Sequence, residues 1–173
     1  MRSDVGCSSS ARSLGHVHAG PFIVFAEEAH EDSADLLFMP EATAADWAAI
    51  FSHAEVRRIG AGLALVQAGE HDRALYLLTE GTVGVRLPRD EGAFKQIDAP
   101  SVLGELAFFD GMPRSATLDA VTDVEVVRLD VAAFDRLLEY EPALAHAMLR
   151  DLARILALRL RLASAVIADL RGA

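Results

Sequence analysis

The region from Leu63 to Leu129 alternates short apolar runs with glycine-containing turns, and this pattern restricts the possible folds more than any other feature. Each run is too short for a helix but long enough for a strand. Gly69 and Gly81 stand between runs, where the tight corners of a β structure often need a positive φ. The expected strands are Leu63–Val66, Leu75–Leu78, Val83–Leu87, Phe94–Ile97, Thr117–Ala120 and Val124–Leu129. Strands at this spacing are typical of a β sandwich or a β roll.

A helix is expected immediately before the β region. Thr43 can cap its N-terminus, Asp46 lies in its first turn, and apolar residues recur at helical spacing until about Ser52. One of these apolar residues is Trp47. An indole ring can serve as a platform for a stacked base, but at this spacing it is far more often part of a hydrophobic core. We therefore expect Trp47 in the core.

A long helix is expected at the C-terminal end. The helical pattern starts at Val131, pauses at Glu141–Pro142, and then meets neither Gly nor Pro from Ala143 to Leu170. Charged residues interrupt this segment, so no apolar run approaches the roughly 18 residues of a membrane span. We expect a helix over residues 143–171, no membrane span, and a mainly β fold with flanking helices (α+β).

Length, charge and cysteine content limit the function classes. The 173 residues suffice for one ordinary domain with an extension. With 26 acidic and 16 basic residues the formal net charge is −10, which disfavours nucleic acid as a partner. The single cysteine, Cys7, excludes a disulfide within the chain and a cysteine-ligated iron–sulfur cluster. Residues 1–20 contain no secretory signal, and the expected localisation is cytoplasmic.

The N-terminal part of the chain differs in composition from the rest. Its first 20 residues are rich in Ser, Gly and His, and acidic residues gather between Glu27 and Asp35. Between them, the apolar run Phe22–Phe25 could be a strand or a docking segment. We expect a partly disordered extension over residues 1–42 and the folded domain over residues 43–171.

The stretch from Leu103 to Leu118 combines one acceptor and one fixed cation on a compact loop. An ionised Glu105 can only accept hydrogen bonds, and a sugar hydroxyl is a natural donor to it. Arg114 offers a planar fork of donors that matches phosphate oxygens. If residues 106–109 form a short helix, its free N–H groups add a backbone anion site. The pairing suits a ligand with both a hydroxyl and an anion.

This stretch resembles the phosphate-binding cassette of the cyclic nucleotide-binding domain family, whose pattern is Gly-Glu-Leu-Ala, a short variable stretch, then Pro-Arg-small-Ala-Thr. The resemblance implies that Glu105 takes the ribose 2′-hydroxyl and that Arg114 takes the cyclic phosphate. It also implies a phosphate cradle that includes backbone N–H groups and the residue after the arginine. The implied ligand-binding residues are Gly104, Glu105, Leu106, Ala107, Arg114, Ser115 and, on the last helix, Arg159.

The β region supports the same resemblance. Gln67-Ala68-Gly69-Glu70, Leu75-Tyr76-Leu77 and Glu80-Gly81 follow the family's order of a glycine turn, a tyrosine-bearing strand and a glycine. The resemblance covers about residues 43–163 and implies a cyclic nucleotide-binding β-roll (a double-stranded β-helix, or jelly-roll) closed by the long C-terminal helix.

At Arg159 the resemblance leaves two roles open, and at Pro100 the chain departs from the family pattern. Arg159 lies near the position that faces the base, where its guanidinium could stack on a purine, or it could simply be solvated. Five residues before the glutamate the family often has a glycine, whereas this chain has Pro100, so we expect the approach to the cassette to differ in shape.

The resemblance implies a regulatory cyclic nucleotide sensor. The ligand is expected to be cAMP, with cGMP possible, because cGMP-selective relatives have a threonine where this chain has Ser115. No enzyme activity, metal or cofactor is expected, since the cassette shows no nucleophile–base pair and no metal constellation. The alternatives are a ligand-free interaction or dimerisation module with the same fold, or the regulatory fragment of a larger transporter, channel or kinase. The chain leaves no room for the helix-turn-helix unit of related transcription factors, so no DNA-binding domain is expected.

The C-terminal helix carries apolar residues around nearly its whole circumference, so we expect it to meet a partner. Residues 150–171 contain five arginines and two aspartates, a net charge of +3, which leaves −13 for the remainder. The helix could pair with a second copy or with an unidentified acidic protein effector. A parallel homodimer is expected, because this helix dimerises in bacterial transcription factors of the family. The seam would consist of Leu149, Leu152, Leu156, Ala163, Ile167 and Leu170.

Overall fold

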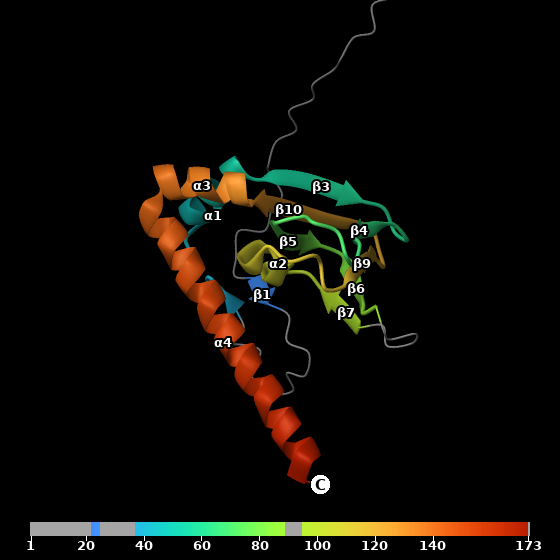
Figure 1. The fold of residues 1–173 in the computed structure, drawn as a ribbon. Helices are drawn as coiled ribbons and strands as arrows, with labels where there is room; N and C mark the ends of the chain where they lie inside the picture. Colours follow the sequence, from blue (N-terminus) through green and yellow to red (C-terminus); the bar gives the residue numbers. More distant parts are fainter. Residues whose placement is uncertain (1–21, 25–36, 89–94, 173) are drawn as a thin grey trace, which may run out of the picture.

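The computed structural model describes residues 22–24, 37–88 and 95–172, which form two β-sheets flanked by helices (Figure 1). The larger sheet contains, in spatial order, β2 (Leu37–Phe38), β1 (Phe22–Val24), β8 (Ser101–Leu103), β5 (Ala74–Glu80), β10 (Val124–Asp130) and β3 (Glu55–Ile59). The smaller sheet contains β4 (Ala64–Val66), β9 (Thr117–Ala120), β6 (Thr82–Arg86) and β7 (Lys95–Asp98). Neighbouring strands are antiparallel except for β1 and β8, which are parallel.

The helices are α1 (Ala44–His53), α2 (Glu105–Asp110), α3 (Val131–Tyr140) and α4 (Pro142–Gly172). Thr43 and Asp46 cap α1 reciprocally: the Thr43 hydroxyl accepts from the Asp46 backbone N–H, and the Asp46 carboxylate accepts from the Thr43 N–H at 2.8 Å. Together with the two sheets, the helices confirm the predicted mainly β roll with flanking helices. All six expected strands occur, and α1 ends one residue after the predicted Ser52.

Two hydrophobic cores lie on the two faces of the larger sheet. Successive side chains of a strand point to opposite faces, so Leu75 and Leu77 of β5 face the helices whereas Tyr76 and Leu78 face the smaller sheet. The core between the larger sheet and the helices is called the helical core below. Trp47 of α1 is fully buried in it, which confirms the prediction that Trp47 is a core residue. Figure 1 shows α1, α3 and α4 together at one side of the strands.

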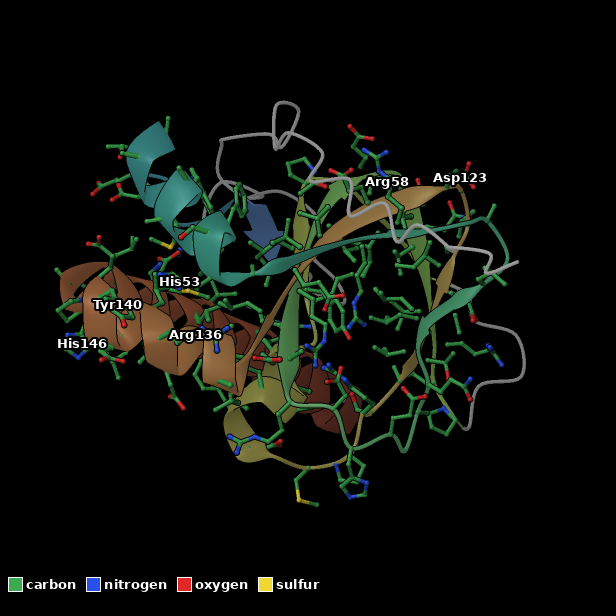
Figure 2. The ribbon with its side chains drawn as sticks, turned by 90° about the horizontal axis from the view of Figure 1, so that it is seen from above. His53, Arg58, Asp123, Arg136, Tyr140 and His146 are labelled. Atoms are coloured by element: carbon green, nitrogen blue, oxygen red, sulfur yellow. The ribbon has the colours of Figure 1, made fainter. Side chains whose placement is uncertain are left out.

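The ends of α1 and α3 meet at this helical side. The ring of His53 stacks on that of Tyr140, with centroids 6.0 Å apart, and both are labelled in Figure 2. Arg136 and His146 lie in the same region of Figure 2, and Arg136 Nη2 lies 3.5 Å from the His53 carbonyl oxygen. These contacts hold the two helices together above the larger sheet.

Strand β3 was not predicted. Among the described strands it is an edge strand paired with β10, and none of its residues is buried, so its apolar pattern is weak. Arg58, which is labelled in Figure 2, anchors it through a 2.7 Å ion pair with the buried Glu125 of β10. Strands β2 and β8 were also not predicted, since a run of two or three residues carries no periodicity.

The larger sheet extends into residues assigned above to the N-terminal extension, because Phe22–Val24 forms β1. Residues 1–21, 25–36, 89–94 and 173 lie outside the described part of the chain. They include Cys7, the acidic residues between Glu27 and Asp35, and the expected strand residue Phe94. Pro100 stands in the turn between β7 and β8.

Among the described side chains, the buried residues of α4 lie between Ala145 and Ile155. Leu152 is 1% exposed and cannot reach a second helix, whereas Leu149 is partly buried and packs against the same core. The predicted seam is therefore wrong at Leu152, while Leu149 and Leu156 are both half-buried. The side chains of the later seam positions, Ala163, Ile167 and Leu170, lie outside the described residues.

Among the described residues, no helix combines the length and the apolar character that a bilayer crossing requires. Helix α4 is also the last described element, so the described part of the chain holds no DNA-binding domain.

Candidate functional site

A cavity of about 350 Å³ opens between the smaller sheet and α2. Its apolar wall includes Val66, Val85, Ile97, Leu103 and Leu118. All seven predicted ligand-binding residues, Gly104, Glu105, Leu106, Ala107, Arg114, Ser115 and Arg159, line this one cavity. The fold thus brings the cassette and a residue of α4 to a single place, and their contact with a ligand stays a prediction.

Gly104 starts α2 in a conformation that only glycine adopts easily. Its φ is +80°, in the left-handed region, and a Cβ at this position would lie 2.4 Å from Arg114 Nη1. The Gly104 carbonyl oxygen in turn accepts a hydrogen bond from the same Nη1 at 3.0 Å. A side chain at position 104 would therefore push away the arginine that the Gly104 carbonyl holds.

Arg114 is a buried cation whose two terminal nitrogens are held by hydrogen bonds. Its side chain is 3% exposed, and Nη2 donates to Asp72 Oδ2 and to the Ala74 carbonyl oxygen, both at 2.8 Å. Its guanidinium also lies 5.3 Å from the centre of the Tyr76 ring. Nε is buried and has no hydrogen-bond partner within the described chain. Within the described residues, Arg114 therefore keeps donor capacity that its protein partners do not use.

Asp72 joins two arginines and a tyrosine. Besides Arg114 at Oδ2, it accepts from Arg128 Nη2 at Oδ1 and from the Tyr76 hydroxyl at Oδ2, both at 2.7 Å. Burial alone would raise the pKa of Asp72, but the hydrogen bonds from Arg114, Arg128 and Tyr76 outweigh it and lower the pKa to about 2. Asp72 is therefore ionised at neutral pH and neutralises the buried cation.

The same network reaches the helices. Arg128 Nη1 donates to Asp130 Oδ2 at 2.8 Å, and the other oxygen of Asp130 caps α3 by accepting from the Ala133 N–H at 2.9 Å. This backbone hydrogen bond is the main reason that the pKa of Asp130 lies below its usual range. Burial opposes the charge of Arg128, but the hydrogen bonds from Arg128 to Asp72 and Asp130 raise its pKa above the ordinary arginine value.

Glu105, in the first turn of α2, is also buried, with 6% of the residue exposed. It forms an ion pair with Arg159, whose Nη1 donates to Glu105 Oε1. The Arg159 side chain is 22% exposed, so the alternative that it is simply solvated is not supported. Ser115 and Leu106 lie at the exposed edge of the cavity.

Sequence reasoning missed Asp72 and Arg128. Arg128 had a recognisable signal, because a charge inside the mostly apolar run Val124–Leu129, which also contains Glu125, implies a partner inside the fold. Asp72 had none, since it follows a polar turn where charged residues are ordinary. Among the described residues, no group of three or more His, Cys, Asp or Glu is placed to hold a metal ion.

Comparisons with known proteins give a consistent picture. A family model described as cyclic nucleotide-binding domain matches residues 56–141. A cAMP-dependent protein kinase regulatory subunit from Colletotrichum orbiculare is 32% identical over 49% of this chain and 22% of that protein. A cyclic nucleotide-gated potassium channel from Mesorhizobium japonicum is 31% identical over 52% of this chain and 24% of that protein. The chain spans about a quarter of the length of these two relatives.

The fold has relatives among solved structures. The crystal structure of the Thermus thermophilus catabolite activator protein matches with a TM-score of 0.66 at 27% identity. The match covers 78% of this chain and 62% of that one.

Proposed function

The chain belongs to the cyclic nucleotide-binding domain family, and from this membership we propose that it is a regulatory module that senses a cyclic nucleotide, with cAMP as the preferred ligand. One observation carries the proposal: Arg114, whose Nε has no partner among the described residues, and the buried Glu105 line the same cavity. The first suits a phosphate and the second a hydroxyl. A cyclic nucleotide contains both groups on one ribose.

In this proposal each part of the ligand has its own partners. Arg114 donates to the cyclic phosphate, helped by the backbone N–H groups of Gly104 and Ala107 and by Ser115. Glu105 accepts from the ribose 2′-hydroxyl. The apolar wall receives the less polar faces of the nucleotide, and the cavity of about 350 Å³ falls within the usual range of small-molecule sites.

A calorimetric titration of the full chain with cAMP tests the proposal. Loss of a charge-assisted contact typically costs about 1.5 to 3 kcal/mol, so Arg114→Ala should weaken binding about ten- to a hundredfold. Arg57→Ala is the control, since Arg57 is a partly exposed arginine of β3 that pairs with Glu55 away from the cavity. Equal cAMP affinity in the wild type and in Arg114→Ala would exclude the assignment.

The preference for cAMP over cGMP depends on position 115. Ser115 has a hydroxyl but lacks the methyl group that restricts the rotamer of the threonine found in cGMP-selective relatives. We therefore expect a modest preference for cAMP, measured by competition of the two nucleotides for one site. A clear excess of cGMP affinity would reverse the assignment.

The output is proposed to pass through α4 to a second copy of the chain or to a partner protein. The two curated relatives above are a channel and a kinase regulatory subunit, both much longer than this chain. Regulation of a transporter, channel or kinase of this kind is therefore included in the proposal. A ligand that prefers one placement of α4 biases the assembly by its difference in affinity for the two placements.

A further inference from the structure

A groove of about 820 Å³ lies apart from the cavity assigned to the ligand, between the start of α1 and the first half of α4. Residues 39–42, which precede α1, line one side, and the flank of α4 from Ala143 to Arg154 lines the other. Ala143, Arg150 and Arg154 are exposed, so the groove is open to solvent. Figure 1 shows α4 at the outer side of the molecule, where a second protein can approach it.

The flank of α4 carries one stripe of four residues. Ala143, Ala147, Arg150 and Arg154 follow one another at intervals of four, three and four residues, which places them along one side of the helix. All four line the groove, whereas the fully buried residues of α4 turn to the helical core. The stripe is thus small and neutral in its first half and long and positively charged in its second half.

The charge changes sign along the stripe. Glu141, immediately before α4, lines the groove, and so does Glu41. At a rise of 1.5 Å per residue, Arg150 and Arg154 follow Glu141 by about 14 and 20 Å along the helix. Arg154 donates to Asp151 of its own helix, whereas Glu41, Glu141 and Arg150 form no ion pair with another described side chain. The acidic and the basic end of the stripe therefore each keep a charge that the described chain does not neutralise.

A surface that is acidic at one end and basic at the other is complementary to a second copy of itself under a twofold axis. An axis at Ala147 would run two α4 helices antiparallel and bring the Ala147 residues of both copies together, where small side chains allow close approach. Arg150 and Arg154 of the second copy would then lie on either side of Glu141. A second copy supplies these matching charges by symmetry, whereas another protein would have to carry the same pattern.

We propose that this stripe is an interface through which two copies of the chain pair by antiparallel contact of the first half of α4. It differs from the parallel seam expected from the sequence, which depends on the later turns of the helix. It also lies outside the cavity assigned to the ligand, so it does not rest on the proposed function. Salt screens exposed charges, so the association should weaken as the ionic strength rises.

Charge reversals followed by sedimentation equilibrium of the full chain test the interface. Arg150→Glu sets a carboxylate against Glu141 of the second copy and should raise the dissociation constant of the dimer about tenfold. In a chain that already carries Glu141→Arg, the same Arg150→Glu change should lower the constant, because opposite charges meet again. Arg161→Glu, an equal change at an exposed arginine outside the groove, is the matched control and should have no effect.

Two outcomes of this experiment would overturn the interface. One is a wild-type chain that stays monomeric at tens of micromolar. The other is an effect of Arg150→Glu that is absent, or that has the same direction with and without Glu141→Arg, because residues in contact must couple. Both positions are exposed, so every variant should keep the circular dichroism spectrum of the wild type.

Spin labels determine the direction of the pairing. In a Cys7→Ser background, Arg161→Cys carries one label in each chain. Antiparallel helices that meet at Ala147 separate the two labels by about 40 Å, whereas a parallel pair along the later turns holds them within about 20 Å. A dipolar electron paramagnetic resonance measurement that finds only the short distance would overturn the antiparallel interface and assign the dimer to the later turns of α4.

Discussion

The carboxylate of Asp72 lies 2.8 Å from the guanidinium of Arg114, although 42 residues separate the two in sequence. Asp72 comes just before β5, and Arg114 follows α2, so the contact joins a turn to the end of the cassette. The other oxygen of Asp72 is held by Arg128. Asp72 therefore helps to fix the orientation of the Arg114 guanidinium at the cavity.

Replacing Asp72 should damage both stability and binding. Asp72→Asn leaves Arg114 and Arg128 without their shared carboxylate, and we expect a loss of about 1–3 kcal/mol in the free energy of unfolding, measured by urea denaturation. Affinity for cAMP should fall as well. Asp119→Asn is the control, because Asp119 pairs with the exposed Arg86 and such pairs contribute at most about 1 kcal/mol. Equal losses in the two variants would contradict the role given to Asp72.

Acid should remove the contribution of Asp72 within a defined interval. Its pKa is about 2 in the folded protein, below the value of about 3.9 for an unfolded chain. A lowered folded-state pKa stabilises the protein above the unfolded value, and this stabilisation disappears as the pH falls through the folded value. The difference in melting temperature between wild type and Asp72→Asn should therefore shrink between about pH 4 and about pH 2. A difference that stays constant over this interval would show that the charge of Asp72 is not its source.

Substitution of Gly104 should reduce cAMP affinity through Arg114. In Gly104→Ala the new Cβ would lie 2.4 Å from Arg114 Nη1 and must displace it. Gly62→Ala is a matched control: its φ of +83° imposes similar backbone strain, but a Cβ there meets nothing within 4 Å. Both variants should lose about 1 kcal/mol of stability from the left-handed backbone. Only Gly104→Ala should bind cAMP more weakly, and equal binding by the two variants would contradict the contact.

The homodimer can be tested without disturbing the core. A chain that ends at Arg161 keeps Leu152 and Ile155, which are buried, and Arg159, but it lacks the last turns of α4. If α4 pairs with a second copy beyond Leu156, light scattering should find a dimer for the full chain and a monomer for the shortened one. A monomeric full chain at tens of micromolar, with and without cAMP, would rule out the homodimer.

Sequence reasoning predicted the elements whose local signals agree with their surroundings. Strand β10 and helix α1 are examples, since one is a buried apolar run and the other has a capping box before helical spacing. Strand β3 was not predicted because its residues are extended through pairing with β10, and their own sequence pattern does not indicate a strand. The burial of Leu152 could not be predicted from the sequence either. Helix α4 is apolar on several sides, and only the packed structure shows which side faces the core.

In the candidate site, too, some residues could be predicted from the sequence and others could not. Residues contiguous in sequence, from Gly104 to Ser115, could be identified from one motif, and all of the predicted set line the cavity. Their supports could not, because Asp72 and Arg128 meet only through the folding of distant strands. The pair of Glu105 with Arg159 was missed for the same reason, although both residues were named.

Asp130 binds Arg128 with one carboxylate oxygen and caps α3 with the other, and this double duty has a consequence for protein engineering. A designer who transplants the cassette as a loop onto a foreign scaffold would carry Arg114 but not the charges that neutralise and orient it. The smallest portable unit must include β5 with the Asp72 that precedes it, and β10 with the start of α3. Although its motif is a continuous stretch of sequence, the site is a property of three separate segments that no loop graft can reproduce.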